Sequence, residues 1–122
     1  MTREDAFHRQ VREALARIPE AFRPYLENVE IQVEDWAPDD LLDEMGVPED
    51  EDLYGVYLGT PLTERGHDHQ GLPDRIVLYR VPLEEDFSDP EELRREIVVT
   101  VLHEVAHHFG LDEARLEELG WG

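Results

Sequence analysis

Residues 89 to 110 form the segment that most constrains the fold, because they read as one long, largely apolar helix with a defined start and end. Asp89 followed by Pro90 is a strong helix start, since the aspartate accepts free backbone N–H groups and proline fits the first helical position. Gly110 is a typical C-cap, because glycine adopts the left-handed conformation without steric cost. Such a helix needs another layer against which to pack its apolar side.

A projection at about 100° per residue divides this helix into two faces. The apolar arc contains Val98, Val101, Leu102, Val105 and Phe109, and the opposite stripe contains Glu96, Thr100, His103 and His107. His108 falls at the edge of the apolar arc, and we interpret it as a packed, hydrogen-bonded histidine rather than a ligand. We therefore expect the back of the helix to lie on a sheet and its front to line a cleft.

His103, Glu104 and His107 have the HExxH spacing of zinc hydrolases. Imidazoles four residues apart lie on the same face of a helix, so His103 and His107 can bind one metal ion. Glu104 lies about 100° around the helix from His103, within reach of a water on that ion. The pattern predicts one catalytic Zn²⁺, with Glu104 as the general base that later returns the proton to a leaving amine.

A catalytic zinc usually takes three protein ligands, so a third ligand is needed. The metzincin pattern HExxHxxGxxH places it ten residues after the first histidine, where this chain has Glu113. We prefer Glu113 on this register. Asp112 is the close alternative, and it also has the features of an N-cap for a helix over residues 112–119.

The run from His103 to Gly110, followed by Asp112, Glu113 and a short helix, resembles the small bacterial zincin-like proteins known as minimal zincins. This resemblance is specific over the last third of the chain. It implies an α+β, metzincin-like fold in which a small mixed β-sheet packs against helices and the active-site helix lies near the C-terminus. It also implies a metal ligated by His103, His107 and the acidic residue after the glycine.

One difference from the larger metzincins concerns the residues beneath the metal. Only nine residues follow Glu113, and the methionines are Met1 and Met45, so the methionine turn of those enzymes is missing. We expect the lower wall of their substrate cleft to be missing as well. We expect a shallow, open cleft, which weakens the case for efficient endoproteolysis more than the case for metal binding.

The length of 122 residues predicts a single domain over residues 1–122, and the absence of cysteine leaves histidine and carboxylate as the metal ligands. Residues 1–10 lack the apolar core of a signal peptide, and no stretch approaches about 18 apolar residues, so the expectation is a soluble cytoplasmic protein.

The formal charge of −20, from 31 acidic residues and 11 arginines, argues against nucleic-acid and membrane partners. It fits a basic peptide or protein substrate, although solubility alone explains such a charge.

The first two thirds of the chain supply the expected sheet and its remaining helices. Periodicity and turn residues predict a helix over 3–17, a turn at 22–26, a strand over 29–34, a helix from Pro38 to Gly46, and a hairpin of strands 54–58 and 75–81 joined by a long loop. Strand 54–58 is either an ordinary strand or an open edge that accepts an extended peptide. His67 and His69 are either part of a surface loop or a second metal site.

Two functions from different classes follow from these features. The first is a zinc-dependent metallopeptidase in which His103, His107 and Glu113 hold the metal and Glu104 is the base. The second is a non-catalytic or vestigial metal-binding module with an acidic surface for protein interaction. Glu104 favours the first and the missing wall favours the second, whereas an acidic mimic of nucleic acid rests on charge alone.

Overall fold

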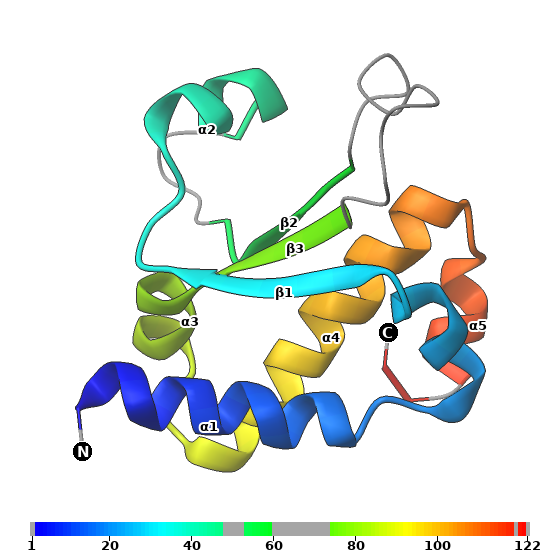
Figure 1. Cartoon of the computed structure of the whole chain (residues 1–122), viewed down its shortest axis with the longest axis horizontal. Coiled ribbons are helices and arrows are strands. Elements are labelled where there is room, and N and C mark those ends of the chain that lie inside the picture. Colours follow the sequence, from blue (N-terminus) through cyan, green and yellow to red (C-terminus); the bar gives the residue numbers. More distant parts are fainter. Residues whose placement is uncertain (1, 48–52, 60–73, 119, 122) are drawn as a thin grey trace.

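The computed structural model describes residues 2–47, 53–59, 74–118, 120 and 121, without the side chains of residues 3, 4 and 113. Helices and strands alternate in no regular order, as the α+β class implies (Figure 1). In chain order they are α1 Arg3–Ala16, the 3-10 helix η1 Glu20–Leu26, β1 Val29–Glu34, α2 Asp39–Met45, β2 Gly55–Leu58, β3 Asp74–Tyr79, α3 Arg80–Asp86, α4 Pro90–Phe109 and α5 Glu113–Glu118.

The three described strands form a mixed sheet in the order β1-β3-β2. β3 is central, and it pairs in parallel with β1 and antiparallel with β2. Its sequence is suited to this place, because its last four residues, Ile76 to Tyr79, form an apolar run that is buried, as in a strand covered on both faces. The expected mixed sheet and the predicted antiparallel pairing of residues 54–58 with residues 75–81 are therefore confirmed.

Successive side chains of β3 point to opposite faces of the sheet, and each face has its own apolar cluster. Ile76 and Leu78 pack into the main core with α1 and α4, whereas Val77 and Tyr79 pack with Val56 on the other face. Figure 1 shows α1 and α4 on one side of the sheet and α2 on the other. The prediction that the back of the long helix lies on a sheet is thus confirmed.

α4 begins and ends at the predicted residues. The side chain of Asp89 accepts a hydrogen bond from the backbone N–H of Glu92, and Pro90 is in the first turn. Gly110 ends the helix with a φ of 66°. The apolar face is buried as projected, with the exception of Phe109, which is 43% exposed.

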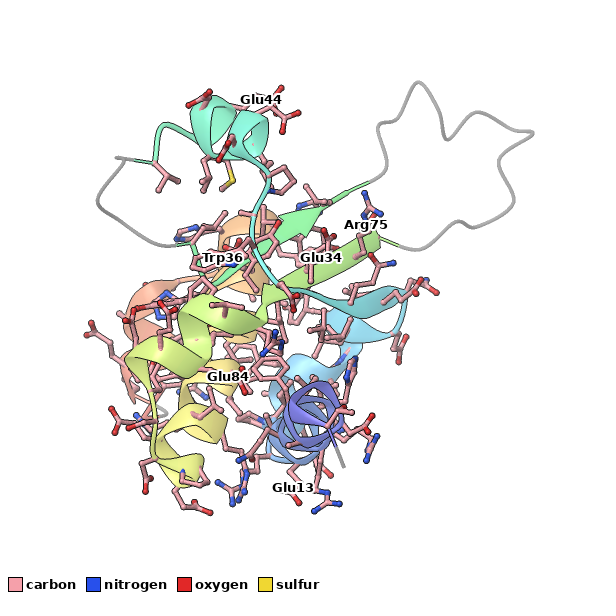
Figure 2. All side chains as sticks on the ribbon, turned by 90° about the vertical axis from the view of Figure 1, so that its left-hand side faces the viewer. Glu13, Glu34, Trp36, Glu44, Arg75 and Glu84 are labelled. Carbon is pink, nitrogen blue, oxygen red and sulfur yellow. The ribbon has the colours of Figure 1, made fainter. Side chains whose placement is uncertain are left out.

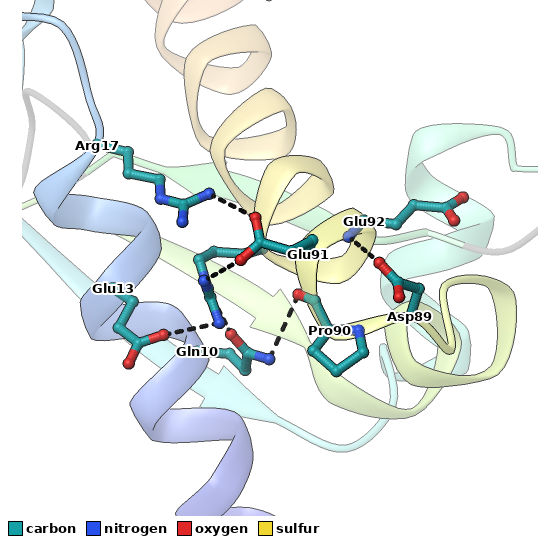
Figure 3. Close-up of polar contacts among 8 residues, drawn as sticks. Gln10, Glu13, Arg17, Asp89, Pro90, Glu91 and Glu92 are labelled. Carbon is teal, nitrogen blue, oxygen red and sulfur yellow. Dashed lines mark hydrogen bonds and ion pairs between the residues drawn. The ribbon is translucent and has the colours of Figure 1, made fainter.

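Polar contacts fix the first turns of α4 against α1 (Figure 3). Arg94 donates to the side-chain oxygen of Gln10 at 2.7 Å and forms an ion pair with Glu13 at 2.9 Å. It also pairs with Glu91 at 2.6 Å, and Arg17 reaches the other oxygen of Glu91 at 3.3 Å. These contacts hold the start of α4 against α1, so the fold also determines where the last turns of α4 lie.

The strand predicted over residues 75–81 is too long at its C-terminal end. β3 ends at Tyr79, and Arg80 begins helix α3. The backbone N–H of Val81 donates to the carbonyl of Asp35, outside the β ladder, and Pro82 has no N–H to offer a neighbouring strand. Proline is tolerated in the first turn of a helix, which is where Pro82 lies.

The other local predictions agree with the structure or lie outside it. α1 and β1 fall within the predicted ranges, and α2 ends at Gly46 with a φ of 68°. The loop that contains His67 and His69 lies outside the described residues, so neither reading of these histidines is tested. Within the described part of the chain, no helix is long and apolar enough to cross a membrane.

Candidate metal centre

The last two turns of α4 carry His103, Glu104 and His107. The two histidines lie one turn apart, with ring centroids separated by 6.5 Å and ring planes at 80°. His103 is partly buried, whereas His107 is exposed. Two imidazoles on one helical face can supply two of the three protein ligands that a catalytic Zn²⁺ usually takes, and they need no thiolate. The residues present therefore fit the ion that the sequence pattern implies.

The carboxylate of Glu104 is held by the edge of the sheet. Its Oε1 accepts a hydrogen bond from the backbone N–H of Tyr57 in β2, at 3.2 Å. Tyr79 donates its N–H to the carbonyl of Tyr54, so the alternation of an antiparallel ladder turns the N–H of Tyr57 away from β3. Glu104 thus accepts a hydrogen bond from an N–H on the side of β2 that faces away from β3.

Burial raises the pKa of the Glu104 carboxyl above its ordinary value of 4.5. The hydrogen bond from Tyr57 and the nearby His107 and His103 lower it again in part, because each favours the charged form. A general base works best when its pKa lies near the working pH, so partial desolvation suits this role.

Gly55 allows α4 to approach β2 closely. A Cβ atom at this position would lie 2.8 Å from Cγ2 of Thr100 and 3.1 Å from the carbonyl oxygen of Val77. Thr100 is one turn before Glu104 on α4, and its hydroxyl donates to the carbonyl of Glu96 at 2.8 Å. The short spacing at Gly55 is what brings Glu104 within reach of the strand.

The chain turns after α4 at the predicted C-cap, Gly110. The N–H groups of Gly110 and Leu111 both donate to the carbonyl of Ala106, and α5 begins at Glu113. Asp112 is a confirmed N-cap, because its Oδ1 accepts the N–H of Ala114 at 2.9 Å. The side chain of Glu113 lies outside the described residues. Among the side chains that are described, no three histidines or carboxylates gather as a metal-binding group.

The prediction of a packed, hydrogen-bonded His108 is met only by a ring stack, because the side chain is 39% exposed. Its imidazole lies on the ring of Tyr57, with centroids 3.9 Å apart and planes at 14°. Nε2 of His108 is 3.9 Å from a carboxylate oxygen of Asp74, which is longer than a hydrogen bond. Sequence reasoning did not assign a role to Tyr57 or Asp74, because neither belongs to a motif.

The methionine that the structure describes is remote from the motif. Met45 is in α2, on the opposite face of the sheet from α4 (Figure 1). It is 45% exposed, so it does not underlie the histidines as the methionine turn of the larger metzincins does.

The order of these elements defines a class of protein: a small mixed sheet lies on a long helix that ends in HExxH and a glycine turn, as in the zincins. The sequence model of the zincin-like metallopeptidase family matches residues 26–121, and the chain belongs to this family. The resemblance inferred from the motif is therefore confirmed.

A solved structure is also similar. It is that of a conserved hypothetical protein from T. thermophilus, with 24% sequence identity and a TM-score of 0.57, over 88% of this chain and 94% of that chain. At this identity the likeness supports the fold alone. No curated protein matches the chain.

Proposed function

We propose that this protein is a zinc-dependent hydrolase of peptide or amide bonds. The observation that carries the proposal is the placement of Glu104, a partly desolvated carboxylate beside two histidines of one helical face, bonded to the edge of the sheet. A purely structural zinc site has no need of such a carboxylate. His103, His107 and Glu113 are the proposed ligands of one ion.

In this proposal the protein groups divide the work of hydrolysis. Zinc would lower the pKa of a water molecule and polarise the carbonyl group of the substrate. Glu104 accepts a proton from the attacking water and delivers it to the leaving amine, while the N–H of Tyr57 keeps the carboxylate oriented. The formal charge of −20 favours basic substrates by attraction at long range.

The test combines metal stoichiometry with turnover, using protein purified without a chelator or an affinity tag. Wild type and Glu104→Gln should each bind one zinc ion, whereas His103→Ala and Glu113→Ala should bind it weakly. Asp112→Asn is the matched control for Glu113→Ala and should retain the ion. A peptide library should then be hydrolysed by wild type and not by Glu104→Gln. Absence of zinc binding by wild type at micromolar metal would refute the proposal.

A second candidate is a binding module, and the surface around α2 favours it. Trp36 is 53% exposed and Met45 is 45% exposed, and α2 has no buried residue. Figure 2 shows Trp36 just below α2 and Glu44 on the outer side of this helix. The neighbouring charges are all acidic from residue 34 to residue 46, with Asp35 paired to Arg80 at 2.9 Å.

This surface suits a basic segment with an apolar anchor, since charge directs the encounter and aromatic side chains dominate the contact energy. The candidate predicts that an arginine-rich peptide with a leucine or aromatic residue quenches or shifts the Trp36 fluorescence. In titration calorimetry, which needs no tryptophan signal, Trp36→Ala should abolish binding and Trp121→Phe should not. Equal binding by both variants would exclude this surface.

A further inference from the structure

The backbone N–H that holds Glu104 belongs to a short strand. Among the described strands, the four-residue β2 lies at an edge of the sheet and pairs with β3. This single hydrogen bond orients the side chain of Glu104 only if the N–H of Tyr57 is itself held in place. If the N–H moves, the glutamate regains its rotamer freedom, and this gain in entropy favours the unbound side chain. The contacts that fix Tyr57 therefore decide the position of the carboxylate.

Among the described residues, the side chain of Tyr57 contacts Asp74, His108 and Phe109. Its hydroxyl donates to Oδ2 of Asp74, the first residue of β3, at 2.7 Å. One ring contact is the stack on His108, and the other is an edge-to-face contact with Phe109, at 6.1 Å and 87°. Phe109 is itself packed against Tyr25 at 5.1 Å. Tyr57 thus joins the neighbouring strand to the last turn of α4.

The backbone after Tyr57 is closely fitted to the same group. A Cβ atom at Gly59 would lie 3.3 Å from Cε1 of His108 and 3.7 Å from Oδ1 of Asp74. The chain therefore passes directly beside the imidazole and the carboxylate that hold the tyrosine. Both His108 and Glu104 are on α4, so one helix contributes the base and part of the support for its hydrogen-bond donor.

We propose that Tyr57 is the positioning residue of Glu104, and that Asp74 and His108 hold Tyr57 so that its N–H meets the carboxylate. The inference rests on the proposed role of Glu104 as the general base. The inference gives a function to Tyr57, Asp74 and His108, which lie outside the HExxH motif. The position of the Glu104 carboxylate then depends on the side chain of Tyr57 in β2.

Hydrogen exchange of one amide in the metal-free protein tests this hold directly. The N–H of residue 57 should be protected in wild type, although it faces the open side of the sheet. It should exchange about tenfold faster or more in Glu104→Ala, which removes a charged acceptor. The amide of Leu78 in the central strand faces β1 rather than β2, so it reports opening beyond the edge strand. If the amide of residue 57 accelerates only as much as that of Leu78, or is unprotected in wild type, the inference is overturned.

A matched pair of tyrosine variants tests the support. Tyr57→Phe removes the hydroxyl that binds Asp74 and keeps the ring, and Tyr54→Phe removes a similar bond from Tyr54 to Asp86, whose length is 2.5 Å. Tyr57→Phe and His108→Ala should each accelerate exchange at residue 57 several-fold. Tyr54→Phe should leave it unchanged. An equal effect of the two phenylalanine variants would show a general loosening of β2 and would contradict the proposed support.

Turnover by the zinc-loaded protein gives the second readout. Tyr57→Phe and His108→Ala should lower kcat several-fold, while KM and zinc stoichiometry stay unchanged, because only the base is misplaced. Faster exchange with an unaltered kcat overturns the positioning role and leaves the proposed hydrolase intact. A wild type that binds zinc and hydrolyses nothing refutes the proposed hydrolase instead, and the exchange result alone then decides whether Tyr57 holds Glu104.

Discussion

Replacing Gly55 by alanine should separate α4 from β2, the contact that gives Glu104 its strand partner. Carbon atoms pack best at about 3.5–4.0 Å, and the new methyl carbon would start 2.8 Å from Cγ2 of Thr100. Overpacking of this kind costs about 1–3 kcal/mol, and the lower entropy of the unfolded alanine chain offsets about 0.5–1 kcal/mol. We expect a net loss of about 1–2 kcal/mol, equivalent to a fall in Tm of roughly 3–10 °C.

Thr100→Ser is the partner substitution, because it removes the crowded methyl group and keeps the hydroxyl that donates to Glu96. Urea unfolding of the four proteins in the cycle should show Gly55→Ala costing less in the Thr100→Ser background, with a coupling of at least about 0.5 kcal/mol. Rescue should be partial, since the carbonyl oxygen of Val77 remains 3.1 Å from the added carbon. Strictly additive effects would refute the idea that this contact sets the spacing of helix and strand.

Three further predictions concern the same helix. Glu104→Gln should raise the Tm of the metal-free protein at neutral pH. Burial raises the folded-state pKa of this carboxyl, so its ionisation opposes folding as the pH rises above about 4.5. The gain in Tm of Glu104→Gln over wild type should therefore vanish in acid. A gain in Tm that is the same at every pH would contradict this account. Asp89→Ala should cost about 1 kcal/mol in urea unfolding by loss of the N-cap, whereas Asp89→Asn should cost little. Gly110→Ala should lower the free energy of unfolding by about 1 kcal/mol through backbone strain alone, because nothing lies within 4 Å of the added carbon. Gly46→Ala is the matched control and should have a similar effect on stability. Only Gly110→Ala should also weaken zinc binding.

The elements that follow from sequence are those whose signals are local. Asp89, Pro90 and Gly110 mark the two ends of α4 by side-chain and backbone chemistry that needs no neighbour. The alternation of residues 29–34 similarly identifies β1. The start of α3 was missed because Val81, a residue typical of strands, follows the apolar run of β3 after Arg80 alone, and the backbone of Val81 bonds to Asp35, which is distant in sequence.

The same distinction between local signals and long-range contacts applies to the candidate site. The positions of His103, Glu104 and His107 on one helix follow from the helical repeat. The bond from Tyr57 to Glu104 depends on the register of β2 and on the approach of α4 at Gly55, and neither is encoded within a short window. For the same reason, the contacts of Asp74 and His108 with Tyr57 required the folded chain.

The place of β3 between β1 and β2 sets the order in which the sheet can assemble. Val29 pairs in parallel with Asp74, and the chain between them includes α2 and β2. Closing a loop of this length costs entropy before any contact rewards it, so parallel pairing is a slow step in folding. During synthesis β1 emerges first and waits with its backbone groups unpaired, which is the condition in which strands associate with other chains. Acidic residues outnumber arginines in the segment before β3, and this net negative charge keeps such copies apart until β3 is made.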